Sequence, residues 1–153
     1  MFTTTKFADK IDQIKPLLTQ LKLNKILSIA LIPNVLPEDE LQAQSLGFNN
    51  IKTIRYDEKP EVALNHIKSF IENIQRLQNL GYKLAIFVED LSTLANIASQ
   101  VDTTENVMKQ IVMLAKSGGK DKHTTLFTTL DETDLFDKNF VSFVYKVSKK
   151  IEL

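Results

Sequence analysis

The sequence predicts a three-layer α/β/α protein, in which helices cover both faces of a mostly parallel sheet. Two observations carry this prediction: short apolar runs of strand length alternate with longer helical patterns, and turn residues separate the two. The 153 residues are 43% hydrophobic and 25% charged, a composition typical of one globular domain over residues 1–153. Right-handed crossovers between the parallel strands are then expected.

Five segments have apolar residues at helical spacing. Pro16 is the weak point of the first, because a proline inside a helix removes a backbone hydrogen bond. The third is the clearest, since its apolar residues follow one face up to Gly81, a natural helix end. The predicted helices cover residues 8–21, 37–46, 62–80, 91–98 and 106–115.

Five further runs are rich in apolar or β-branched residues, as strands are. They cover residues 26–32, 51–56, 84–88, 124–130 and 140–147. The first, apart from Ser28, and the third are apolar, which suits strands buried on both faces. In a parallel sheet, ligands bind at the carboxyl ends of the strands. That rule selects four residue pairs for chemistry: Pro33-Asn34, Asp57-Glu58, Glu89-Asp90 and Asp131-Glu132.

Acidic residues at these strand ends are the first candidate site. Glu89, Asp90 and Asp131 offer the hard carboxylate oxygens that a magnesium ion prefers, beside a bound nucleotide. The alternative is that such acids cap the helices that follow or are solvated, and Asp90 before Leu91 is a good N-cap. The second interpretation is favoured for these positions taken alone.

The other sequence features give no support for a phosphate loop, a histidine metal site or a thiolate site. Ser117-Gly118-Gly119-Lys120 superficially resembles a phosphate loop, but here the order is helix, glycines, strand, so a polar turn is favoured. His66 and His123 are the only histidines, too few for a histidine-rich metal site, and both are expected on the surface or in helix packing. The chain has no cysteine, which excludes disulfides and thiolate sites.

The charge balance bears on nucleic acids and membranes. A formal net charge of zero removes the long-range attraction for polyanions. Lys146, Lys149 and Lys150 near Tyr145 are the sole approximation to an RNA-contacting surface, and a strand with a solvated end is preferred. Neither a signal peptide nor an apolar run of about 18 residues is present, so no membrane association and a cytoplasmic location are expected.

Three stretches carry a resemblance to a known family. Residues 88–95 (VEDLSTLA) keep the shape of an L-D-S-[IL]-T-R-L-A helix start, residues 118–130 (GGKDKHTTLFTTL) are similar to a G-G-S-L-T-I-I-A-T-A-L strand, and residues 148–151 (SKKI) to an S-R-K-I ending. In this order they resemble the ATPase domain of the bacterial transcription termination factor Rho, a RecA-like P-loop NTPase. The resemblance covers residues from about 26 to 153 and implies a truncated, RecA-like form of the α/β fold.

The motifs that the resemblance links to catalysis are altered. No Gly-Lys-Thr precedes the first helix, and Pro33-Asn34 stand where the family has an acidic pair that includes the water-activating glutamate. Glu89 stands where the family's magnesium-linked aspartate is expected, and Thr93 and Asn96 replace two arginines. The resemblance thus implies a kept scaffold with a lost hydrolytic site.

We therefore expect a degenerate Rho/RecA-like domain without a cofactor, which binds a protein partner or associates with itself. One alternative is a nucleotide-binding ATPase module completed by another chain, with Mg²⁺ and ATP at Glu89, Asp90 and Asp131. Another is an RNA-binding accessory protein that uses Lys146, Lys149 and Lys150. Salt-dependent RNA binding would be the signature of the last.

Overall fold

A four-stranded parallel sheet lies at the centre of the protein. The computed structural model describes residues 11–89, 91–101, 110, 113 and 124–128. Its strands are β1 (Leu27–Val35), β2 (Asn50–Arg55), β3 (Leu84–Val88) and β4 (Thr124–Thr128), in the order β2-β1-β3-β4 with every neighbouring pair parallel. The prediction of an α/β fold with a parallel sheet is confirmed.

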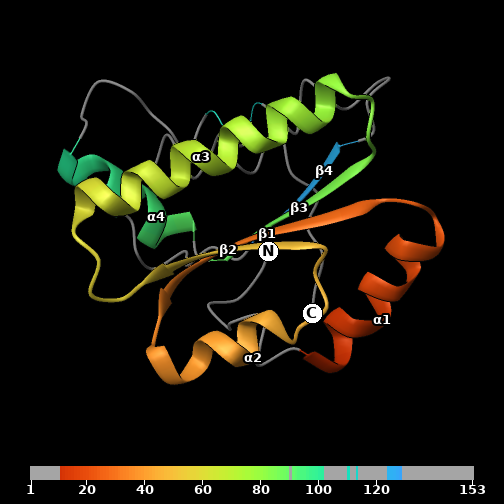
Figure 1. Ribbon diagram of the computed structural model, residues 1–153, viewed down its shortest axis with the longest axis horizontal. Helices are drawn as coiled ribbons and strands as arrows, with labels where there is room; N and C mark the ends of the chain where they lie inside the picture. The colour runs from red at the N-terminus through yellow and green to blue at the C-terminus, as the bar shows by residue number, and fades with distance from the viewer. Residues whose placement is uncertain (1–10, 90, 102–109, 111–112, 114–123, 129–153) are drawn as a thin grey trace.

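Helices cover both faces of this sheet. They are α1 (Ile11–Leu23), the 3-10 helix η2 (Pro37–Asp39), α2 (Glu40–Gln44), α3 (Pro60–Asn79) and α4 (Leu91–Val101). Figure 1 shows α3 and α4 on one face and α1 and α2 on the other. Of the helix predicted over residues 106–115, only residues 110 and 113 are described, both helical. The strand predicted over residues 140–147 lies outside the described residues.

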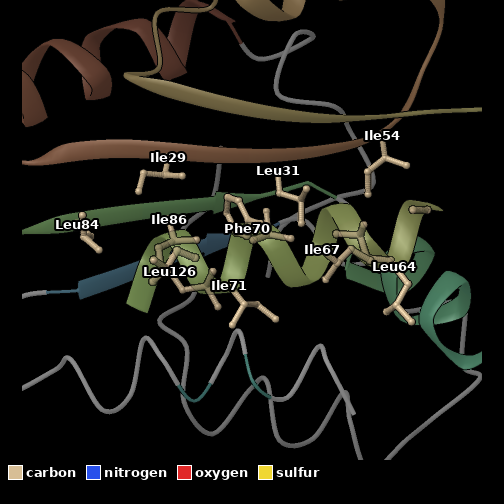
Figure 2. Packing of buried hydrophobic residues seen from close by; sticks show 14 residues of the cluster. Ile29, Leu31, Ile54, Leu64, Ile67, Phe70, Ile71, Leu84, Ile86 and Leu126 are labelled. Carbon is tan, nitrogen blue, oxygen red and sulfur yellow. The ribbon is translucent and has the colours of Figure 1, made fainter. Parts of the chain in front are cut away.

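One face of the sheet packs against α3. Alternate residues of a strand point to opposite faces, and Ile29, Leu31, Leu84 and Ile86 share this one. Figure 2 shows these side chains directed towards the apolar stripe of α3. The buried apolar residues of that stripe recur every three or four positions, as the periodicity predicts; they are Ala63, Leu64, Ile67, Phe70, Ile71 and Ile74. This long helix closes its face of the sheet.

The opposite face packs against α1 and α2. The other alternate residues of the strands, Ala30, Ile32, Ala85 and Phe87, form a second buried cluster there. Aromatic rings strengthen it: Phe87 stacks on Phe127 with ring centroids 4.7 Å apart. From the helices the cluster takes Ile14, Leu18 and Ala43, followed by Leu46 and Phe48. Because α2 has only five residues, this face is covered by two shorter helices.

The two longest of these helices, α1 and α3, end in the same backbone turn. After α3, the N–H of Gly81 donates to the carbonyl of Gln78 and the N–H of Tyr82 to that of Leu77, which is a Schellman motif. Gly81 has φ +86°, so its lack of a Cβ suits the left-handed conformation. After α1, Lys25 takes the equivalent position with φ 57°. Sequence reasoning predicts the first turn from its glycine and misses the second.

Candidate functional site

A pocket lies at the carboxyl ends of β1 and β3. The connection after β1 runs through α2 to β2 on one side, and the connection after β3 runs through α4 towards β4 on the other. Such a switch point is where open α/β sheets bind ligands. The space between its walls is about 470 Å³, part of it open to solvent. Its lining comes from β1, η2, α2 and the end of β3: Ile32, Pro33, Asn34, Val35, Asp39, Gln42, Ala43, Leu46 and Glu89.

An irregularity in β1 opens the sheet at this point. Ile32 pairs with Thr53 and Val35 with Arg55, so Pro33 and Asn34 together stand opposite one residue of β2. This is a β-bulge, a device that re-aims side chains beside functional sites. Asn34 is exposed and has φ 57°, a conformation that asparagine tolerates better than most residues. The sequence prediction ended the strand at residue 32; the strand in fact continues to Val35 through the bulge.

Glu89 is the most buried polar residue of the pocket. Glu89 follows β3 directly and is only 4% exposed. Its backbone N–H donates to the carbonyl of Leu31 at 3.0 Å. It continues the alternation of Ala85 and Phe87, which places it on the face of α1 and α2. Glu89 therefore lines the pocket as a buried residue. It is also one of the candidate site residues predicted from the sequence.

The remaining lining is apolar inside and polar at the mouth. Ile32, Val35 and Leu46 belong to the buried cluster of this face, whereas Asn34 and Gln42 are exposed. Asp39, from η2, is half-buried and adds a second carboxylate. Among the described residues that line the pocket, none carries a positive charge. The arrangement suits a ligand with an apolar body and a cationic or hydrogen-bond-donating end, and disfavours a phosphate.

The other predicted site residues fall elsewhere. Asp90, Asp131, Lys146, Lys149 and Lys150 lie outside the described residues, so the structure does not bring them to Glu89 or hold them away from it. In the part of the chain that is described, no three His, Asp or Glu side chains lie close enough together to hold a metal ion. In the same part, no helix is long and apolar enough to cross a membrane.

Acids that follow β2 form local pairs away from the pocket lining. Arg55 Nε lies 3.3 Å from a carboxylate oxygen of Asp57. His66 Nε2, on α3, lies 3.3 Å from Glu58 Oε2, an oxygen with almost no exposed surface. His66, expected on the surface or in helix packing, is half-buried on α3. Both pairs are local to the β2–α3 connection, and neither includes a residue that lines the pocket.

Sequence reasoning missed the part of the site that comes from η2 and α2. Asp39 and Gln42 line the pocket beside Ala43, yet none of the three was a candidate. The available signal was Pro37 with its acidic neighbours, which marks a helix starting directly after the first strand. A helix in that place necessarily lies over the carboxyl end of the sheet, where ligands bind.

Together, the fold and the pocket define an α/β protein with a parallel sheet and a candidate binding site at its switch point. Neither a scan against protein-family models nor a search of curated proteins found a match to this chain.

Proposed function

We propose that this chain is a non-hydrolysing domain of the Rho/RecA type that acts by binding a protein partner. The observation that carries the proposal is the character of the pocket: two carboxylates, Glu89 and Asp39, and no cation among the described lining residues. Phosphate-binding sites present backbone amides, lysine or arginine to the anion. A pocket lined by carboxylates is negatively charged, as a nucleoside triphosphate is, and therefore repels it.

The bulge residues support the loss of hydrolysis. Under the resemblance to Rho, Pro33-Asn34 replace the acidic pair that includes the water-activating glutamate, and both residues line the pocket. Neither side chain accepts a proton from water at neutral pH, so neither serves as a general base. The 153 residues also contain no G-x-x-x-x-G-K-[ST] motif to hold the phosphates.

Exposed apolar residues beside the pocket support a protein partner. Leu41 lies in α2 between residues of the η2–α2 segment that lines the pocket, and it is 84% exposed. Tyr56 is 56% exposed, and its N–H donates to the carbonyl of Val35, a lining residue. Tyrosine is enriched at the hot spots of protein–protein interfaces. Two exposed apolar residues therefore flank the pocket.

Thermal-shift and calorimetric titrations with ATP, ADP and RNA, each with Mg²⁺, test this proposal. We expect no saturable binding of any of the three, because the described pocket lacks a cationic side chain. Saturable binding of ATP with Mg²⁺ would contradict the proposal and favour the alternative of a nucleotide-binding module. In that case Glu89→Gln, compared with Glu72→Gln on an exposed acid of α3 outside the lining, would show whether the nucleotide occupies this pocket.

Self-association is the second form of protein binding that the sequence leaves open. Sedimentation measurements over a wide concentration range separate it from binding to a different protein. A single monomeric species at all concentrations excludes self-association, and a concentration-dependent dimer or larger assembly indicates that the partner is a second copy of the chain.

A further inference from the structure

A lysine-containing partner fits the described pocket better than other ligands. Resting on the proposed function, we propose that the pocket between β1, β3 and α2 receives a lysine side chain from a basic segment of the partner protein, with its ammonium group paired to Glu89. This assigns a ligand chemistry to the site and a role to its buried carboxylate. Two features of the described residues support this assignment: the apolar walls beside a buried carboxylate, and the acidic residues of the η2–α2 segment.

The pocket lining offers both kinds of surface that a lysine side chain needs, apolar walls and a carboxylate. Lysine buries its four-carbon stem against apolar surface and keeps its charged end on a polar partner. Here Ile32, Val35 and Leu46 supply buried apolar walls, and Glu89 supplies the buried carboxylate. A carboxylate has about four lone-pair positions, so Glu89 can accept an ammonium group in addition to the contacts it makes in the free protein.

The mouth of the pocket is rich in acids. Glu38, Asp39 and Glu40 come from the η2–α2 segment that covers the pocket. Such a mouth attracts a basic segment and raises its association rate, while it repels nucleic acid and other polyanions. The charge therefore favours a basic protein segment as the occupant.

Other cations fit less well. A divalent metal ion needs several hard oxygen ligands, and no three Asp, Glu or His side chains of the described residues lie close enough together to hold one. An arginine is wide and planar and is best served by a bidentate partner with room on both sides. The ammonium of lysine is a compact point charge that can pair with a single carboxylate such as Glu89. A free organic amine shares this chemistry and must be separated by experiment.

The test is an amide chemical-shift titration of the whole chain with three acetyl pentapeptide amides. The first is Ala-Ala-Lys-Ala-Ala; in the second the lysine is Nε-acetylated, and in the third it is norleucine. We expect the lysine peptide to shift the amides of Val35, Gln42 and Glu89 with a Kd on the order of 1 mM. The two uncharged peptides should bind about tenfold more weakly or not at all, because neither offers an ammonium group.

Variants locate the effect. Glu89→Gln should weaken binding of the lysine peptide about tenfold or more, since it removes the buried charge. Glu72→Gln, which removes one charge from an exposed site on α3 outside the lining, should change it less than about twofold. If Glu89→Gln does not fold, Gln42→Lys replaces it: an added ammonium group at the exposed rim should compete with the peptide and weaken its binding by a similar factor.

Three outcomes would overturn the inference. They are equal binding of the acetylated peptide, shifts confined to residues away from the pocket, and tighter binding of free putrescine than of the peptide, which would indicate a small amine as ligand. Each is distinct from failure of the proposed function, which would show as binding of ATP with Mg²⁺. A protein that binds neither nucleotide nor lysine peptide keeps the proposed function and loses this inference.

Discussion

The amino edge and the carboxyl edge of the sheet are built on different plans. At the amino edge, α1 and α3 end in matching turns, and the N–H of Leu27 donates to the carbonyl of Lys83, which ties β1 to the chain entering β3. At the carboxyl edge, β3 stays paired with β1 only as far as Leu31, while β1 continues beside β2 to Val35. The neighbours of β1 thus separate where the bulge lies, and the pocket occupies that place.

The two edges differ in how regular their backbone is. Closed turns at the amino edge satisfy the last carbonyls of two helices and hold the strands in register. The carboxyl edge gives up a regular ladder and contains Pro33 and Asn34, residues unsuited to a central strand. Local irregularity of this kind persists when the surrounding structure supports it, and it is common at binding sites. The regular turns thus lie at the amino edge, and the candidate binding pocket lies at the carboxyl edge.

Truncation of one leucine at each edge gives the largest expected contrast. Leu84 and Leu46 are 1% and 2% exposed, but Leu46 borders the pocket. Leu84→Ala should lower the free energy of unfolding by about 3 kcal/mol or more, and Leu46→Ala by about 2 kcal/mol, because one side of Leu46 already lacks neighbours to lose. Urea unfolding followed by circular dichroism measures both. An equal or larger loss for Leu46→Ala would show that the pocket wall is as tightly packed as the amino edge.

A polar link at the amino edge should have the next largest effect. Ser28 is buried; its N–H and Oγ–H both donate to Asn49 Oδ1, and its Oγ accepts from the N–H of Asn49. Ser28→Ala should cost about 1–2 kcal/mol, because two of these three hydrogen bonds are lost in a buried setting. Ser45→Ala, which removes an exposed hydrogen bond to Gln42, serves as the control and should cost less than about 0.5 kcal/mol. Equal costs would contradict a structural role for the link.

The two matching turns allow a smaller test with opposite signs. Lys25→Gly should stabilise the protein by up to about 1 kcal/mol, since glycine occupies a left-handed position without strain. Gly81→Ala should destabilise it by about 1 kcal/mol, although an added Cβ would meet no atom within 4 Å. Thermal unfolding measures both shifts. If Gly81→Ala were neutral, the backbone conformation of this turn would not limit its sequence.

Most of the described fold could be predicted from the sequence because its signals are strong and local. The apolar stripe of α3 and the largely apolar runs of β1 and β3 identify elements whose length and burial leave few alternatives. The continuation of β1 through Pro33 and Asn34 could not be predicted, because both residues ordinarily end a strand. Pairing with Arg55 overrides that preference, and such long-range pairing is invisible in a local window.

The candidate site was predicted in part. Glu89 and Pro33-Asn34 follow from the rule that ligands bind at the carboxyl ends of parallel strands, and all three line the pocket. Asp39 and Gln42 were missed because their place depends on how η2 and α2 fold back over the sheet. The charge of the pocket lining could not be predicted either, because the sequence does not show which acidic and basic residues line the same pocket.

The most direct test of the account is steady-state ATP hydrolysis by the whole chain with Mg²⁺. We expect no hydrolysis above that of buffer, and the same result for Glu89→Gln, because the described lining offers carboxylates and no cation to a triphosphate. Hydrolysis that Glu89→Gln abolishes and Glu72→Gln, on an exposed acid of α3, leaves unchanged would contradict the account. It would show that the pocket at the carboxyl edge is a working catalytic site.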